Sequence, residues 1–287
     1  MAGLRLDQAL ARMLPGESRT RLARLIGQGH VRVDGAPAEP KRKMRSGEAV
    51  EIVLAPRIEA SAFAPEEIAL DIVHEDEDVI VVNKPAGLVV HPGSGNWAGT
   101  MLNALLHHAP GSGELARAGI VHRLDKDTSG LLVVARNEVA QASLVRQLQA
   151  RTVKRTYLAV VRGVVKAPGS VDAPIGRHPK QRTRMAVVAG GKPAVTHYRV
   201  KKAFPAHTLL ECDLETGRTH QIRVHLASIG HPIEGDAVYA GRGPRLIARQ
   251  ALHAWKLAFV HPRSGAAMRF EAPLPRDMKA LLESLRA

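Results

Sequence analysis

The strongest signal in this chain is the stretch Gly119-Ile120-Val121-His122-Arg123-Leu124-Asp125-Lys126-Asp127-Thr128-Ser129-Gly130-Leu131-Leu132-Val133-Val134. An apolar run lies near each end of this stretch, at 120–121 and at 131–134, and both runs are typical of buried strands. The connection between them carries two carboxylates and two cations, whereas a hairpin needs only a short turn of Gly, Asn or Asp. Loops held between rigid strands often carry catalytic groups. On the residues alone, a polar turn closed by Gly130 is as good an interpretation as a catalytic loop.

Composition and charge indicate a folded protein with a polyanionic partner. The 287 residues are 45% hydrophobic and 24% charged, which is enough for one large domain and one small domain. The net charge is +14, and residues 141–205 contain fourteen Lys or Arg against one acid, Asp172. Such asymmetry marks a nucleic-acid footprint more often than a merely solvated surface. Aromatic residues are only 3% of the chain, so we do not expect binding by many stacked bases.

Several classes of protein are excluded by what the sequence lacks. It has no apolar run long enough to span a membrane, and residues 1–7 lack the apolar core of a signal peptide. We therefore expect a cytoplasmic protein. A single cysteine, Cys212, excludes an internal disulfide and a Cys-rich zinc site, and there is no His-Glu-x-x-His motif. The sequence predicts no metal site and no cofactor.

Residues 1–54 are predicted to form a small separate domain. Leu6, Leu10 and Leu14 share one helical face, and Ser18 is a candidate cap for a second helix. Two helices followed by strands at 31–33 and 50–53 resemble an S4 domain, an RNA-binding module. Its predicted RNA-binding residues are Arg19, Arg21, Arg24, Lys41, Arg42 and Lys43. Residues 55–68, dominated by Ala, Pro and charge, are predicted to be a linker to a larger domain over 69–287.

The larger domain alternates apolar strands with few helices. Many strands without regular intervening helices argue against a doubly wound parallel sheet. We predict an α+β fold with a long mixed, mostly antiparallel central sheet. The predicted strands are 72–73, 79–82, 153–161, 194–200 and 208–214. Helices are predicted after Thr100, Asn137 and Thr219, and over 277–285. The acidic residues 75–78 are predicted to form a turn.

A second dense motif runs from Thr216 to Leu226. Ile222, Leu226 and Ile229 mark one face of a predicted helix that Gly230 ends. Arg218, His220 and Arg223 then crowd the start of that helix. Cations at a helix N-terminus oppose the helix dipole, so they are expected to serve a nearby anion.

Two of these motifs resemble one known family. His-Arg-Leu-Asp-Lys-Asp-Thr-Ser-Gly-Leu at 122–131 resembles the signature of the RluA-type family of RNA pseudouridine synthases, and Gly-Arg-Thr-His-Gln-Ile-Arg at 217–223 is similar to a second family motif. The resemblance runs through nearly the whole chain. The small-subunit branch has Gly where this chain has His122, which favours the large-subunit branch.

The resemblance implies a fold, a reaction and a substrate. It implies the pseudouridine synthase fold with an N-terminal S4 domain, acting without a cofactor. It also implies a monomeric isomerase acting on 23S ribosomal RNA or a large-subunit precursor, with the helix 69 stem-loop as the target. Two alternatives remain: a sister synthase that modifies other 23S uridines, and a non-enzymatic S4-type RNA-binding or ribosome-assembly factor.

The resemblance also implies roles for individual residues. Asp125 is the expected catalytic carboxylate, Arg223 its counter-charge, and Tyr157 the ring on which the flipped uracil stacks. Whether Asp125 attacks C1′ or removes a ribose proton is open at this stage. Arg123, Lys154, Arg155, Lys180, Arg182, Arg184, Arg218 and His220 are the residues expected to contact RNA.

Overall fold

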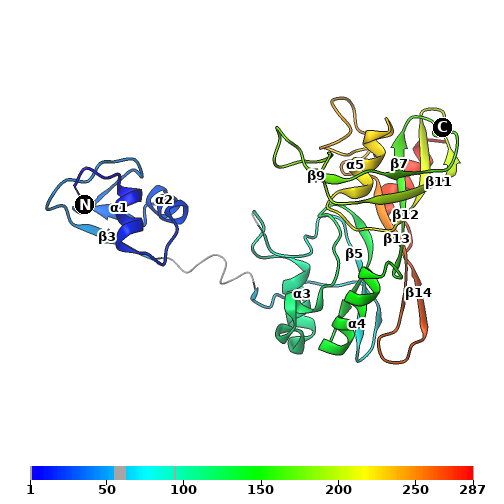
Figure 1. Cartoon of the computed structure of the whole chain (residues 1–287), viewed down its shortest axis with the longest axis horizontal. Helices are drawn as coiled ribbons and strands as arrows, with labels where there is room; N and C mark the ends of the chain where they lie inside the picture. The colour runs from blue at the N-terminus through cyan, green and yellow to red at the C-terminus, as the bar shows by residue number, and fades with distance from the viewer. Residues whose placement is uncertain (1, 55–62, 94, 287) are drawn as a thin grey trace. The chain divides into compact units, whose positions relative to one another are not determined.

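The computed structural model describes residues 2–54, 63–93 and 95–286, in two compact units that span residues 1–60 and 61–287 (Figure 1). The first unit contains helices α1 (Leu6–Met13) and α2 (Arg19–Gly27) and the strands β1 (Val31–Val33), β2 (Ala36–Pro37) and β3 (Val50–Ile52). The strands form an antiparallel sheet in the order β2-β1-β3. Leu6, Leu10 and Leu22 are fully buried between the helices and this sheet. Ser18 caps α2, as predicted, by accepting a hydrogen bond from the backbone N–H of Arg21.

The second unit is built on one long sheet. Within the described residues its strands run in the order β4-β5-β6-β13-β7-β12-β11-β8, with β14 beside β13, and every pair except β6–β13 is antiparallel. This confirms the predicted mixed, mostly antiparallel sheet. The strands are β4 (Ile72–Glu75), β5 (Val79–Lys84), β6 (Ser129–Ala135), β7 (Lys154–Arg162), β8 (Gly169–Asp172), β11 (Val195–Ala203), β12 (His207–Leu214), β13 (Leu252–Val260) and β14 (Ala267–Glu271); β9 (Ile175–Arg177) and β10 (Met185–Val187) form a separate hairpin.

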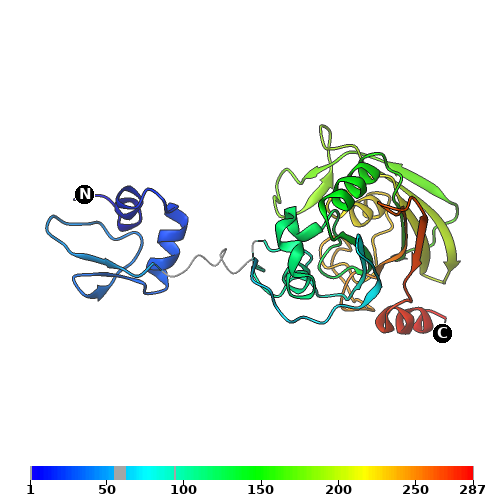
Figure 2. The same ribbon diagram turned by 90° about the horizontal axis from the view of Figure 1, so that it is seen from below.

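Helices cover this sheet and bury its apolar side chains. They are α3 (Met101–His108), α4 (Glu138–Gln149), α5 (Gln221–Ser228) and α6 (Arg276–Ser284), with short 3₁₀ turns at Pro110–Glu114 and Ala116–Gly119. All of β6 is buried, and its side chains alternate between two cores. Leu132 packs in the core that includes α3 and α5, whereas Leu131 packs with Leu144 of α4. The C-terminal helix α6 lies at the periphery of the unit (Figure 2) and buries Met278 and Leu281.

Two predicted elements are wrong in detail. Residues 120–121 form no strand, because Ile120 makes one isolated antiparallel bridge to Val134 before the chain turns away from the sheet. Helix α5 starts at Gln221, and its N-cap is His220 in the left-handed conformation, with φ of 56°, instead of Thr219. The helix ends at Ser228, so Ile229 is outside it and 37% exposed.

The predicted linker lies mostly outside the described residues, at 55–62. The rest of it contacts the second unit: the carboxylate of Glu66 accepts hydrogen bonds from the backbone N–H of Gly99, and the Ala64 carbonyl accepts one from the side chain of Asn103. None of the described helices is long and apolar enough to cross a membrane.

Candidate active site

One cleft of about 1240 Å³ gathers both sequence motifs. Its walls come from the central loop (residues 121–128), from β7, and from the segment that joins β12 to α5. Asp125, Tyr157 and Arg223 all line it. Asp125 and Arg223 lie 98 residues apart in the chain, so the fold brings together what the sequence only suggested.

A buried lysine holds the central loop through hydrogen bonds to backbone carbonyls. Lys84, at the end of β5, has no exposed surface, and its ammonium donates hydrogen bonds to the carbonyls of Pro85, Leu88 and Lys126 at 2.7, 2.9 and 2.9 Å. Burial lowers the pKa of Lys84 to about 7, against the attraction of carboxylates such as Asp127. Three carbonyl acceptors require three N–H donors, which only the ammonium form has. These hydrogen bonds therefore favour the charged lysine and fix the loop at residue 126.

The other half of the loop is tied to the segment before β13. Arg249 donates to the carbonyl of Asp127 at 2.9 Å, and Gln250 donates to the hydroxyl of Thr128 at 3.3 Å. Within the loop, the Thr128 backbone N–H donates to the Asp125 carbonyl at 3.1 Å. The backbone on both sides of the Asp125 side chain is thus held in place before any substrate arrives.

Arg223 joins two carboxylates. Its Nη1 donates to Asp125 at 3.0 Å, and its Nε and Nη2 donate in a fork to Asp236 at 2.7 and 3.0 Å. The side chain of Asp236 is fully buried, whereas that of Asp125 is 18% exposed to the cleft. Burial lowers the pKa of Arg223, but hydrogen bonds and charge from Asp236, and then from Asp125, raise it overall. The guanidinium therefore stays protonated and supplies a fixed positive charge beside Asp125.

Asp236 is a site residue that the sequence reasoning missed. Burial favours its neutral form, yet the contacts with Arg223 and the backbone N–H groups of Val238 and Tyr239 hold its pKa below the usual range. No sequence signal marked it, because a lone Asp thirteen residues after Arg223 belongs to no recognisable spacing. Its role is to hold the guanidinium that faces Asp125.

Tyr157 forms part of the wall of the cleft. It lies on β7 opposite Cys212 of β12 and is 6% exposed, at the edge of the apolar core. Burial raises the pKa of its hydroxyl, with the charge of Arg155 opposing the rise and that of Asp125 adding to it. A flat, mostly apolar ring with a neutral hydroxyl is therefore presented near the carboxylate.

His220 completes the group around Asp125. Its Nε2 lies 3.9 Å from Asp125, and its Nδ1 lies 2.9 Å from the hydroxyl of Tyr239. That hydroxyl also accepts the backbone N–H of Met185 at 3.0 Å, and its own proton is available to the histidine. Burial, opposed by the Asp125 charge, lowers the pKa of His220. When the Tyr239 hydroxyl donates to Nδ1, the proton of the neutral ring is on Nε2, which faces the carboxylate.

The residues predicted to contact RNA fall into three groups. Those that line the cleft are Arg123, Arg155, Arg218 and His220. Lys180, Arg182 and Arg184 lie on the connection between β9 and β10, outside the cleft lining. Lys154 is exposed and also outside the lining, because it precedes Arg155 on β7 and therefore points to the opposite face of the sheet.

The basic residues predicted in the first unit are partly neutralised there. Arg19 pairs with the buried Asp7 at 2.9 Å, Arg42 pairs with Glu48 at 2.7 Å, and Arg21 lies 3.3 Å from Glu17. By contrast, Arg24, Lys41 and Lys43 are exposed. Their role in RNA binding stays a prediction.

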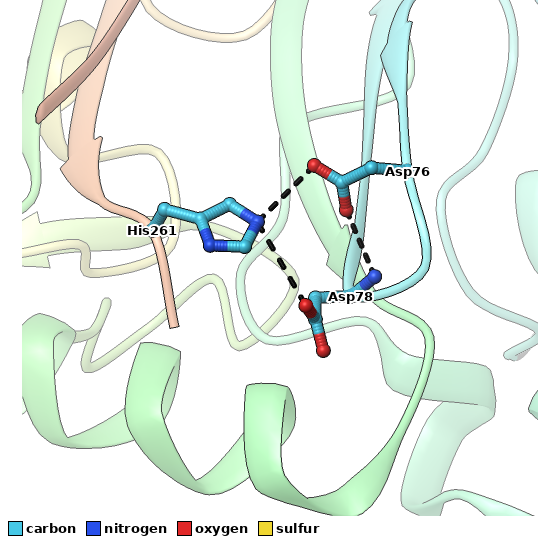
Figure 3. A group of neighbouring side chains, drawn as sticks. All are labelled: Asp76, Asp78 and His261. Atoms are coloured by element: carbon cyan, nitrogen blue, oxygen red, sulfur yellow. Dashed lines mark hydrogen bonds and ion pairs between the residues drawn. The ribbon is translucent and has the colours of Figure 1, made fainter. Parts of the chain in front are cut away.

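The acidic turn at 75–78 is a closed structural cluster. Asp76, Asp78 and His261 come close enough together to hold a metal ion (Figure 3). However, one carboxylate oxygen of Asp76 already accepts the backbone N–H groups of Asp78 and Val79, and the other lies 3.1 Å from His261. Arg263 pairs with both oxygens of Asp78 at 2.8 and 2.9 Å. These contacts account for the cluster without an ion, and the absence of a metal site stays a prediction.

Comparison with known proteins identifies the family. The sequence model of a family described as RNA pseudouridylate synthase matches residues 78–228, just over half of the chain. A protein of Nitrosomonas europaea named ribosomal large subunit pseudouridine synthase D is 58% identical over 294 residues, covering 100% of this chain and 86% of that protein. The chain belongs to the RNA pseudouridylate synthase family. As a member of this family it is an isomerase that converts uridine in RNA into pseudouridine.

Further relatives agree with this family. An Escherichia coli K12 protein with the same printed name is 53% identical over 300 residues, covering 99% of this chain and 91% of that protein. The model of the S4 domain matches residues 4–50, which confirms the predicted S4 domain. The solved structures of human RNA pseudouridylate synthase domain containing 1 and 4 superpose with TM-scores of 0.57 and 0.61, at 26% and 27% identity. They cover 82% and 75% of this chain and 98% and 92% of their own chains, and confirm the pseudouridine synthase fold.

Proposed function

We propose that this pseudouridylate synthase modifies 23S ribosomal RNA, at uridines of the helix 69 stem-loop, as a cytoplasmic monomer. The observation that carries the chemistry is the carboxylate of Asp125, held 3.0 Å from Arg223 in a cleft whose wall includes Tyr157. The choice of RNA is supported by relatives named large subunit synthases, by the S4 domain, and by the basic surface.

The reaction breaks one bond to C1′ and forms another. The glycosidic bond between C1′ and N1 breaks, the uracil turns, and C1′ bonds to C5; C5 then loses its proton while N1 gains one. Two routes use Asp125: its carboxylate attacks C1′, or it removes a ribose proton. Both routes need an ionised carboxylate inside a closed cleft, where burial alone favours the neutral acid. Arg223 supplies the compensating charge, and Asp236 keeps Arg223 in position.

The uridine must leave its stack to reach Asp125. Tyr157 offers the ring on which the flipped uracil stacks, an interaction of about 1–3 kcal/mol per base in comparable sites. Its hydroxyl is neutral because its pKa is raised, so it is suited to relay the C5 proton. His220, neutral and with Nε2–H toward Asp125, adds a donor beside the same carboxylate.

The basic residues position the RNA. Arg123 and Arg218 line the cleft and are exposed, so they suit phosphate contacts or the gap left by the flipped base. Lys180 and Arg182, both exposed on the β9–β10 connection, extend this surface beyond the cleft. Phosphate contacts of this kind fix orientation without reading sequence.

The test is to map pseudouridines in 23S rRNA from cells that lack this protein. We expect them to be missing from the helix 69 stem-loop and to be restored by the wild-type protein but not by Asp125→Asn. Loss at other 23S positions would identify a sister synthase instead. An unchanged map, or full restoration by Asp125→Asn, would contradict the proposal.

A further inference from the structure

Arg155 is a buried cation that has no partner. The residue is only 9% exposed, and its Nε is fully enclosed without a hydrogen bond. Among the described residues, its guanidinium forms neither a hydrogen bond nor an ion pair. Arg223 and Lys84 are buried to a similar degree, but every nitrogen that they present is satisfied. Only Nε is enclosed in this way, so the Nη1 and Nη2 atoms of Arg155 keep contact with the cleft that the residue lines. A guanidinium that faces a cleft without a protein partner is suited to an anionic ligand.

The position of Arg155 tells where that ligand binds. Arg155 precedes Tyr157 by two residues on β7, so both side chains lie on the same face of the sheet and line the same cleft. The guanidinium lies against Gly217, where a Cβ would stand 2.7 Å from Nη1. A side chain at position 217 would displace the end of the arginine from this place. The guanidinium of Arg155 therefore lies two residues along β7 from the ring of Tyr157, on the same face of the sheet.

A second donor, His122, lines the same cleft as Arg155. His122 accepts the backbone N–H of Val133 on Nε2 at 3.1 Å, so the proton of the neutral ring is on Nδ1. Burial, followed by the charge of Arg155, lowers the pKa of His122 to about 3. The ring lines the cleft, and its Nδ1–H has no acceptor within the described part of the chain. His122 is thus a neutral donor in the same cleft as the unpaired guanidinium, and within reach of its charge.

We propose that Arg155 and His122 form a site for one phosphate group of the bound RNA, adjacent to the flipped uridine. This inference rests on the function proposed above and adds a specific contact to it. A guanidinium matches phosphate geometry with two parallel hydrogen bonds, and a neutral N–H adds a third. The carboxylate at this end of the cleft, Glu215, is already paired with Arg151 at 3.0 Å and with His197 at 2.7 Å. The protein therefore leaves the charge of Arg155 for a ligand.

The site predicts that Arg155 is dispensable for the stability of the enzyme without RNA. Arg155→Met removes a charge that has no partner in the described protein and keeps an apolar chain of similar length, so the thermal midpoint of the free enzyme should not fall. The exposed neighbour Lys154 provides the matched control, because Lys154→Met removes a charge from the opposite face and should change the midpoint little. A fall in the midpoint of Arg155→Met would mean that the guanidinium serves the fold, and would overturn the assignment.

The decisive experiment identifies the phosphate. Stem-loop RNAs are prepared in which each phosphodiester in turn is replaced by a neutral methylphosphonate, and their dissociation constants are measured with wild-type enzyme, Arg155→Met and Lys154→Met. We expect one linkage at which wild type loses about 10- to 100-fold in affinity, the range for a hydrogen bond to a charged group. Arg155→Met should bind native RNA more weakly than wild type by a similar factor. Its affinity should not fall further when the methylphosphonate is placed at that linkage. His122→Phe should reduce the effect at the same linkage, and Lys154→Met should leave it intact.

The result separates the two proposals. In one outcome, wild type converts uridine in the stem-loop, but the affinity lost through Arg155→Met and the affinity lost through a methylphosphonate are independent at every linkage. The phosphate site is then wrong and the proposed function stands. If wild type forms no pseudouridine in the stem-loop, the proposed target is wrong, and the phosphate site assigned to that RNA falls with it.

Discussion

Replacing Arg223 with methionine removes one cation that serves two carboxylates. Three charge-assisted hydrogen bonds are lost, one to Asp125 and two to Asp236, whose side chain is fully buried. Breaking a buried ion pair by removing one partner costs about 3–5 kcal/mol. In a unit of this size, each kcal/mol shifts the thermal midpoint by roughly 2–4 °C. The second unit of Arg223→Met should therefore melt on the order of 6–20 °C below that of wild type.

The pH dependence of this loss has a definite sign. In wild type, the pKa of Asp236 is depressed, so its contribution to stability is present above the ordinary Asp pKa and is lost as pH falls through the folded value. In Arg223→Met, burial acts on Asp236 without the cation and raises its pKa, so the folded state takes up a proton more readily than the unfolded chain. The stability gap between variant and wild type should therefore shrink as the solution is acidified from neutral pH.

Activity should follow pH in the opposite direction. Without Arg223, the carboxylate that faces the cleft loses the cation beside it, and turnover of Arg223→Met should recover in part as pH rises. The assay combines thermal unfolding with single-turnover pseudouridine formation, each measured from mildly acidic to mildly alkaline pH. Arg223→Lys is the control, because it keeps a charge but not the planar fork. A pH–rate profile parallel to wild type, or an unchanged midpoint, would refute the pairing of Arg223 with the two carboxylates.

Substitutions at three further residues and one truncation test the remaining roles. Asp125→Asn should abolish product formation while leaving the fold and RNA affinity largely intact; wild-type turnover in that variant would contradict the assigned chemistry. Tyr157→Phe should stall only the final C5 proton transfer if the hydroxyl acts, whereas near-normal turnover with a defective Tyr157→Ala would leave the ring as a stacking surface only. Lys84→Met should lower the free energy of unfolding by several kcal/mol, because three buried carbonyls lose their donor at about 1–3 kcal/mol each; an unchanged unfolding curve would show that water replaces it. Deleting residues 1–54 should weaken rRNA binding and reduce the slope of its salt dependence, because phosphate contacts are lost; an identical salt titration would exclude an RNA role for the S4 domain.

Local signals in the sequence were sufficient for most elements of the fold. Caps at Ser18, Thr100 and Asn137 were predicted correctly, because a side chain that accepts a hydrogen bond from the helix start is a local feature. Thr219 has the same chemistry but is not the cap, since His220 adopts a left-handed conformation there and places its ring against the Tyr239 hydroxyl. A tertiary contact thus overrides a local preference at a site residue.

The central motif shows the same limit. The apolar run at 131–134 was a reliable strand signal, because a strand buried on both faces needs continuous apolar residues. The run at 120–121 was not, because Ile120 is buried through a single bridge and not through a ladder. A run of apolar residues indicates burial but not strand pairing, because a loop at the edge of a core is buried without joining a sheet.

The family resemblance implied the pairing of Arg223 with Asp125, but no sequence pattern indicated the other partners of the buried cations. Lys84 donates to three carbonyls and therefore holds the backbone of the loop. Arg223 contacts two carboxylates, one buried and one open to the cleft, and therefore holds the carboxylate that we propose to be catalytic. Arg155 has no hydrogen-bond or ion-pair partner in the described chain, and only its Nε is enclosed, so the rest of its guanidinium stays open to the cleft. An open, unpaired guanidinium is suited to a ligand anion. RNA that binds Arg155 through a phosphate should therefore stabilise the second unit through the same contact that orients the RNA strand.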